Sequence, residues 1–367
     1  MDRTFYKELP DLILGFTKSL RVENSYKFKP LKKGITKNGE SLSLGFSCYA
    51  LKIYYMTGEL SNFKENELDG WAKYINSFQA HNDNYLTDYF IDPIYEKYYT
   101  SVFSKETVTS LTKNILNNFT NKNYDSKKIK LQKGLAAETK QALATLAEIG
   151  KSNSNKIEFE HKSFKEIELY LDSLDWSKPW SAGGQFSSFC IYSTTQNLKY
   201  EQNLLNYVGK LADPVSGSYF KETPNSSREF INGGMKIISG LDWLDEEIHY
   251  PSKLIDYCLD NKPILEGCDI VDFVYVLFKC SQQSNHRKIE ISKLFVELLD
   301  DIQKLFIEDL GGYSYFHNKS QTHYYGVPIS RGLNTPDLHG SLLCLWAVLM
   351  ILKFLEIGNP NWNIIKP

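Results

Sequence analysis

The sequence predicts an all-α protein in which consecutive helices pair and stack around a ring. Hydrophobic residues recur at helical spacing through nearly the whole 367-residue chain, and alternating strand-like runs are almost absent. In addition, one kind of segment recurs three times: a helical stretch, a short turn with Gly or an acidic residue, and then an aromatic pair. Internal repeats indicate a stacked architecture in which each unit covers the apolar face of its neighbour.

The three copies of this repeat also bear on how the helix pairs are arranged. The helical stretches and the aromatic positions that follow them are 71–79 with Tyr89 and Phe90, 204–208 with Tyr219 and Phe220, and 305–310 with Tyr313, Tyr315 and Phe316. Paired helices can form an open solenoid or a closed ring. The aromatic turns favour the ring, because inner helices converge there and their connecting turns roof a central cavity.

Helical spacing and end signals divide the chain into about twelve helices. The clearest are 41–57, ended by Gly58, and 135–149, ended by Gly150. The others, in chain order, are 68–79, 106–119, 163–173, 184–194, 199–212, 229–240, 251–260, 268–281, 288–308 and 337–355. Polar stretches at 117–133 and 150–156 are expected to be surface excursions. Neither is long enough to demand a second domain, so we expect residues 1–367 to form a single domain.

Composition narrows the class of protein. With 42% hydrophobic and 23% charged residues, the chain can bury a large core. A net charge of −2 without a basic stripe argues against nucleic-acid binding. The most apolar window, 338–355, is interrupted by His339, Gly340 and Lys353, which indicates a buried helix and no transmembrane segment.

The cysteines and the first residues of the chain bear on location. Six cysteines lie mostly within apolar helical runs and show no CxxC pairing, as expected for reduced thiols. The first residues lack the apolar core of a signal peptide. We therefore expect a cytoplasmic protein, and its oligomeric state does not follow from the sequence.

The paired helices, the spacing of Tyr74, Ile75 and Gln79, and the Gly-Gly-Tyr-Ser-Tyr turn at 311–315 resemble the prenyltransferase and terpenoid-cyclase repeat proteins. Those proteins fold as α/α toroids, with inner and outer rings of helices around a central pocket. The resemblance implies an α/α toroid of about six helix pairs. It also implies an enzyme that acts on an isoprenoid or isoprenyl-phosphate substrate.

Two stretches near the end of the chain resemble the zinc-binding helices of protein prenyltransferases: 270–278, with Asp272, and 337–346, with His339. A catalytic zinc site needs three protein ligands and one open position. Val274 stands where that family has its cysteine ligand, and valine cannot ligate; Cys268 and Cys344 lie nearby at other spacings. We therefore expect no metal and no cofactor, and the departure argues against protein prenylation.

Cyclases that protonate an alkene use an Asp-x-Asp-Asp cluster, in which neighbouring carboxylates raise the pKa of the acid. The acidic stretches 242–247 and 172–176 do not carry this pattern. Aromatic residues are available for carbocation chemistry, but a proton donor of the cyclase type is not recognisable.

Polar residues gather instead beside the predicted turns. The loop 321–337 carries His323 and Tyr324, which suit base and acid roles because His titrates near neutral pH and Tyr can protonate a leaving oxygen. His339 follows the loop, and Asp272 or Asp337 could orient an imidazole. These five residues are our candidates for acid–base catalysis, and the alternative is that the histidines are structural.

Other residues near the same turns suit substrate binding. Trp180 and Tyr325 offer stacking faces, and Lys236 and Arg331 could receive a carboxylate or phosphate. Further polar candidates are Gln185, Asn232, Asp269 and Gln321. The Gly-Gly pairs among these segments have a plainer interpretation, as helix caps or points of close helix approach.

Three hypotheses follow for the function. The first is an enzyme that resembles terpenoid cyclases and prenyltransferases. The alternative is a carbohydrate-active toroid, a polysaccharide lyase, glycoside hydrolase or epimerase, since a hydrophilic pocket with stacking faces suits a sugar better than a hydrocarbon. The third is a toroid that binds a small molecule without catalysis, because fold alone does not decide function.

Overall fold

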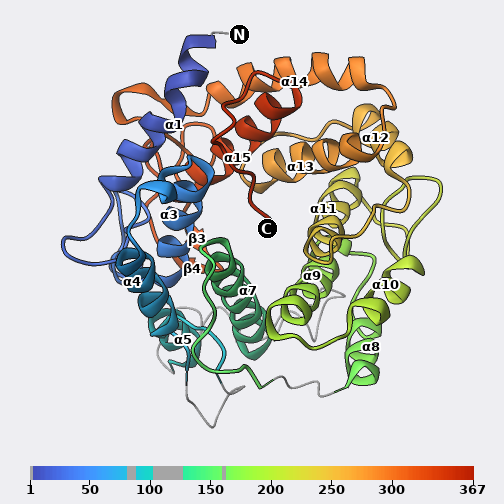
Figure 1. The fold of residues 1–367 in the computed structure, drawn as a ribbon, viewed down its shortest axis with the longest axis horizontal. Helices are drawn as coiled ribbons and strands as arrows, with labels where there is room; N and C mark the ends of the chain where they lie inside the picture. The colour runs from blue at the N-terminus through green and yellow to red at the C-terminus, as the bar shows by residue number, and fades with distance from the viewer. Residues whose placement is uncertain (1–2, 81–87, 102–126, 159–162) are drawn as a thin grey trace, which may run out of the picture.

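The computed structural model describes residues 3–80, 88–101, 127–158 and 163–367. These residues hold fourteen α-helices, two short 3₁₀ helices and four two-residue strands. The long helices form two concentric rings (Figure 1).

Six helices form the inner ring: α3 (Leu44–Met56), α7 (Lys127–Glu148), α9 (Pro179–Gln196), α11 (Ser227–Trp243), α13 (Cys268–Gln283) and α15 (Leu338–Phe354). Each contacts the next, and α15 closes the ring by packing on α3. Six outer helices each precede an inner one in the chain: α1 (Arg3–Lys18), α4 (Glu65–Asn76), α8 (Phe164–Asp172), α10 (Glu201–Gly209), α12 (Pro251–Asp260) and α14 (Lys288–Gln303). This confirms the predicted all-α fold, an α/α toroid of six helix pairs.

The remaining elements are short. They are α2 (Lys37–Ser41), η1 (Glu59–Asn62), α5 (Pro93–Thr100), η2 (Glu308–Leu310), β1 (Phe306–Ile307), β2 (Gly312–Tyr313), β3 (His323–Tyr324) and β4 (Val327–Pro328). Strands β1 and β2 form one antiparallel hairpin, and β3 and β4 form another. Within the part of the chain that the structure describes, no helix is long and apolar enough to cross a membrane.

Hydrophobic patterning places each helix in its ring. Almost every residue of α15 is buried, as expected for a helix that is apolar on all sides and lies in the core. The outer helix α14 buries only one stripe, Ile291, Phe295, Leu298, Leu299 and Ile302, at helical spacing.

All six cysteines are unpaired thiols, and five of them are buried.

The predicted aromatic turns are equivalent in space as well as in sequence. Each follows an outer helix and closes with an antiparallel pair: Gln79 with Phe90 after α4, Ala212 with Tyr219 after α10, and Phe306 with Tyr313 after α14. The aromatic partners Phe90, Tyr219 and Tyr313 are fully buried. The repeat therefore marks the points at which the chain leaves the outer ring and turns towards the next inner helix.

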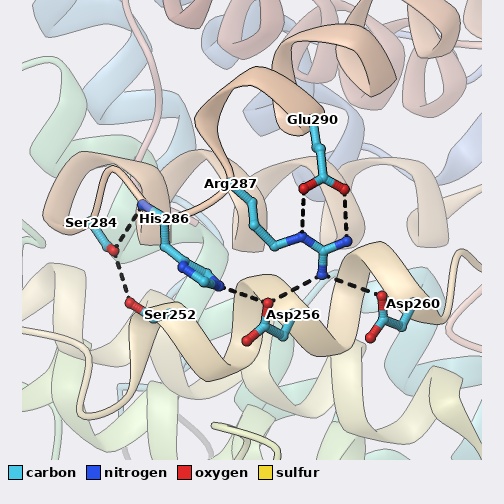
Figure 2. Close-up of polar contacts among 7 residues, drawn as sticks. All are labelled: Ser252, Asp256, Asp260, Ser284, His286, Arg287 and Glu290. Carbon is cyan, nitrogen blue, oxygen red and sulfur yellow. Dashed lines mark hydrogen bonds and ion pairs between the residues drawn. The ribbon is translucent and has the colours of Figure 1, made fainter.

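An ion-pair cluster ties the outer helices α12 and α14 together (Figure 2). Arg287, just before α14, contacts Asp256 (3.1 Å) and Asp260 (3.3 Å) on α12, and Glu290 (2.8 Å) on its own helix. His286 Nε2 lies 2.7 Å from the same Asp256 carboxylate. Because these groups are largely in contact with solvent, the cluster fixes the geometry of the two helices more than it adds stability.

The structure differs from the predicted elements in several places. Helices α1, α2 and α5 were not predicted. Residues 127–133 form the first turns of α7 and are not part of the predicted polar excursion 117–133, because Leu131 and Gly134 lie on a face of the helix that is buried. Residues 306–307 pair as strand β1 and do not extend the helix predicted over 288–308. The predicted helix 106–119 and residues 117–126 of the excursion lie outside the described residues.

Candidate functional site

A cavity of about 480 Å³ lies inside the inner ring, a size typical of small-molecule sites. All six inner helices line it, and five of them do so through residues spaced three or four apart on one face, such as Trp180, Gly184 and Ser188 on α9. The hairpin β3–β4 and the turn before it complete the wall through Gln321, His323 and Tyr324.

Nine of the residues predicted to form the site line this cavity: Trp180, Gln185, Lys236, Asp272, Gln321, His323, Tyr324, Tyr325 and His339. They come from four segments that lie far apart in the sequence, and the ring brings them to one space. His323 and Tyr325 are exposed, and they mark the open mouth of the cavity.

Asp337 has a different place from the one predicted. Its carboxylate caps the start of α15, where it accepts hydrogen bonds from the backbone N–H groups of Gly340 (2.8 Å), Tyr315 (2.9 Å) and Gln321 (3.0 Å). Burial raises its pKa to about 6, although these backbone donors oppose the rise. A carboxylate committed to three backbone groups acts as a structural cap and does not orient an imidazole.

Three other candidates, Asn232, Asp269 and Arg331, also lie outside the lining. The Arg228 guanidinium binds both oxygens of Asp269 (2.9 and 2.8 Å) and lies 4.3 Å from the centre of the Trp180 ring. The Asn232 side-chain amide donates to the same Asp269 carboxylate (2.7 Å). Asn232 and Asp269 therefore support Trp180 from behind. Arg331 is exposed and does not line the cavity.

Lysines and one carboxylate set the electrostatics of the cavity. Asp272 is the one carboxylate among the described residues that line it, and burial raises its pKa to about 6. Burial, together with the nearby positive charge of Lys236, lowers the pKa of Lys140 to about 7. Lys140 donates to the Ser187 hydroxyl (3.1 Å). The acid and the amine therefore have pKa values near neutrality, which suits proton transfer.

A third lysine on the wall is neutralised within the protein. Lys52 forms a buried ion pair with Glu148 at 2.6 Å. Lys236 thus supplies positive charge that faces a ligand, beside the Lys140 amine with its lowered pKa and the carboxyl group of Asp272.

His339 stacks on the ring of Tyr49, with 4.5 Å between ring centres. Burial, reinforced by the charge of Lys236, lowers the pKa of His339 to about 3, so its imidazole is neutral near pH 7. In this form it can accept a hydrogen bond from a ligand, but so low a pKa makes it a weak base, unlike the acid–base role predicted for it.

Several buried polar atoms of the wall have no hydrogen-bond partner among the residues that the structure describes. They are Asp272 Oδ2, Gln321 Oε1, His339 Nδ1 and Trp346 Nε1, and all four residues line the cavity. Leaving such a group unpaired costs about 1–3 kcal/mol. The cavity therefore offers both donors and acceptors to a polar occupant.

The hydroxyl of Tyr324 is engaged by the wall. It donates to Glu138 (3.2 Å), whose other oxygen accepts from the Asp92 N–H (2.8 Å). Burial, with the charge of Asp92, raises the pKa of Glu138 to about 8. The hydroxyl also fills the space beside Gly45, where an added Cβ would lie 2.1 Å from it. Tyr324 thus presents its ring to the cavity, and its hydroxyl is less available for the predicted acid role.

Among the described residues, no group of three or more His, Cys, Asp and Glu side chains is arranged to hold a metal ion. The absence of bound zinc thus stays a prediction, based on Val274.

Lys140, Gln141 and Tyr49 also line the cavity and were not predicted from the sequence. Lys140 and Gln141 belong to a polar run, 138–141, between apolar residues of α7, and this break in the middle of a predicted helix was the available signal. Tyr49 gave none, since an aromatic residue in an apolar helix is usually core.

No family model and no curated protein matches the chain. Two solved structures are similar in fold at low identity. One is an alpha-1,6-mannanase of Salegentibacter sp. HEL1_6, solved as an inactive variant with alpha-1,6-mannotetrose (11% identity, 95% of this chain and 99% of that chain, TM-score 0.48). The other is a polysaccharide lyase (12% identity, 96% of this chain and 98% of that chain, TM-score 0.44). At such values the likeness does not assign a function, so the function has to be argued from the residues of the cavity.

Proposed function

We propose that this protein is a carbohydrate-active enzyme that acts on an acidic saccharide by acid–base chemistry in the central cavity. The observation that supports this most is the combination of unpaired buried polar atoms with Lys140, Lys236 and Asp272 around one cavity. A sugar presents hydroxyl groups on every side, so it can pair with donors and acceptors around the ring. Trp180, backed by Arg228, offers an aromatic face for a sugar ring.

An isoprenoid substrate finds less support in this cavity. A hydrocarbon would leave Asp272, Gln321 and His339 without partners, and each unpaired buried group costs about 1–3 kcal/mol. The carbohydrate alternative is therefore favoured over the terpenoid one.

The two-carboxylate mechanism of most glycoside hydrolases is a poor fit, because it needs a pair of carboxyl groups on either side of the scissile bond. Asp272 is a single carboxyl group in the described lining. The residues fit β-elimination from a uronate better. Lys236 faces the substrate carboxylate, and the neutral Lys140 amine takes the proton from the adjacent carbon. The freed electron pair forms a C=C bond as the C–O bond to the next sugar breaks, and protonated Asp272 gives its proton to the leaving oxygen.

The test is to incubate the protein with a panel of uronate-containing polysaccharides and to follow the ultraviolet absorbance of the unsaturated product. We expect absorbance to rise with at least one polymer, and Asp272→Asn to abolish the rise. New reducing ends without this absorbance would indicate a hydrolase. Binding without turnover would leave the non-catalytic toroid as the better description.

A further inference from the structure

The bore of the ring holds a second pocket beyond the cavity. This pocket, of about 370 Å³, is lined by later residues of four inner helices: Tyr55 of α3, Asp242 of α11, Lys279 and Gln282 of α13, and Lys353 of α15. Earlier residues of the same four helices line the cavity, for example Cys268 and Asp272 on α13. The two spaces therefore lie at successive levels along one axis.

The segment 363–367 lies between the two spaces. Ile365 and Pro367 line the cavity, whereas Asn363, Ile364, Ile365 and Lys366 line the second pocket. Ile365 is only 3% exposed. Figure 1 shows the end of the chain at the middle of the ring.

The segment is fastened to both sides of the bore. On α3, the Asn363 N–H donates to the Met56 carbonyl (3.0 Å), and its side-chain amide donates to the Tyr55 carbonyl (2.9 Å). At the end of α11, the Trp243 indole donates to the Pro367 carbonyl (3.0 Å).

Lys366 adds a further anchor at the same helix end. Its ammonium group binds the Asp242 carbonyl (2.7 Å) and the Asp245 carboxylate (2.6 Å). These bonds hold backbone and side chains alike, so the segment is fixed across the bore between α3 and the end of α11.

We propose that segment 363–367 determines substrate specificity: it closes the far end of the cavity, so that a saccharide enters from the mouth at His323 and Tyr325 alone. The ligand is then a chain terminus or a short oligosaccharide, and not the interior of a threaded polymer. The identity of the ligand rests on the proposed function, whereas the closure does not.

Closure is tested without substrate by cross-linking through the bore. Gln282→Cys places a thiol in the second pocket, and Cys268 lies in the cavity; both are on α13, about 21 Å apart at 1.5 Å per residue. A bismaleimide of that span should bridge the two thiols in a chain that lacks residues 363–367 and not in the full chain. Equal bridging in both chains would overturn the closure.

Controls keep this result interpretable. A monofunctional maleimide must modify both thiols in each chain, and the parent with Gln282 reports any background from the other cysteines. Should the shortened chain fail to fold, the double variant Trp243→Phe, Lys366→Ala removes the anchors on α11 and keeps the length. It should then bridge faster than the full chain, and bridging at the rate of the full chain counts against the proposal.

Specificity is tested by the products formed from an acidic polysaccharide. The full chain should release short products from chain ends with a slow fall in viscosity. The chain without 363–367 should cut internally, so that viscosity falls several-fold faster per bond broken. Identical product patterns would overturn the role in specificity. If no polymer is turned over, the proposed function fails, and the cross-link still decides the closure.

Discussion

Lys140 and Asp272 have pKa values that burial moves towards each other, to about 7 and about 6. Each also feels the charge of the other, so the titration belongs to the set of groups and not to one residue. A lysine without its proton and a carboxyl group with one can coexist near neutral pH. This is the condition that an acid–base pair needs.

The first prediction concerns this pair. Activity should follow a bell-shaped pH profile with limbs near pH 6 and pH 7, because Asp272 must keep its proton and Lys140 must lose one. Lys140→Arg should lower kcat by at least about 100-fold, since arginine stays protonated. Binding of the acidic saccharide should persist. Lys128→Arg, an exposed change on the same helix, is the control, and equal losses in both variants would contradict the role of Lys140.

The second prediction concerns the stability cost of Asp272. Its pKa is higher in the folded chain than in the unfolded one, so the folded state binds the proton more tightly. Stability is therefore lost as pH rises from about 4 to about 6. Asp272→Asn should raise the free energy of unfolding at pH 7 by on the order of 1–3 kcal/mol. At pH 3 the same substitution should change the free energy of unfolding little. Denaturant titrations at both pH values check this. A variant less stable at pH 7 would contradict the assignment.

Residues that line the cavity were predictable where they stood beside a recognisable turn, as with Trp180 and Gln321. Asp337 was misjudged because a capping carboxylate and a catalytic one look alike in sequence, and only three backbone N–H groups from distant segments tell them apart. Lys140 was missed because its setting, opposite Asp272, exists only once the ring has closed.

At the level of elements, α15 depends on its cap. Asp337→Ala removes the acceptor for three buried N–H groups and should lower the free energy of unfolding by about 2–4 kcal/mol. Thermal denaturation checks this. Asp213→Ala removes a loop carboxylate that accepts from the N–H and hydroxyl of Ser216, so it should cost less. If Asp337→Ala abolished turnover with an unchanged melting temperature, the catalytic assignment would be restored.

Helix α3 depends on the absence of a side chain at Gly45. An added Cβ would meet the Tyr324 hydroxyl, so Gly45→Ala should destabilise the fold by about 1–3 kcal/mol. Gly15→Ala is the matched control: it lies on α1 with nothing within 4 Å and should stabilise by about 0.5–1 kcal/mol. Urea titrations of both variants measure the contrast, and equal shifts would refute the steric argument.

Elements were predictable where periodicity and end signals agreed. Helix α12 has the bounds that its pattern predicted, 251–260, beginning at Pro251 in the first turn. Helix α1 was missed, although Tyr6, Leu9, Ile13 and Phe16 follow a helical stripe. Pro10 lies inside that helix and lacks the N–H of a normal helical residue, which weakens the local signal. The packing of α1 on α3 and α15 stabilises this helix despite the proline.

At the level of the whole molecule, helix pairs were predictable and ring closure was a judgement. Whether pairs stack into a solenoid or a ring depends on a small rotation per pair, which no local pattern encodes. The structure settles it through the contact of α15 with α3, and α1 packs on both. Helices α1 and α15 thus meet α3 at one seam, and segment 363–367, which follows α15, binds α3 and the end of α11.

This seam leads to the last prediction. In an open repeat array each unit contacts only its neighbours, so terminal units can unfold first. In a closed ring every inner helix packs between two neighbours. The unfolding of one inner helix therefore exposes the apolar faces of both neighbouring helices. We expect residues 1–367 to unfold as one domain, with far-ultraviolet and near-ultraviolet circular dichroism changing at the same temperature. Two separated transitions, or a stable fragment after limited proteolysis that lacks α1 or α15, would show that the seam does not couple the ring.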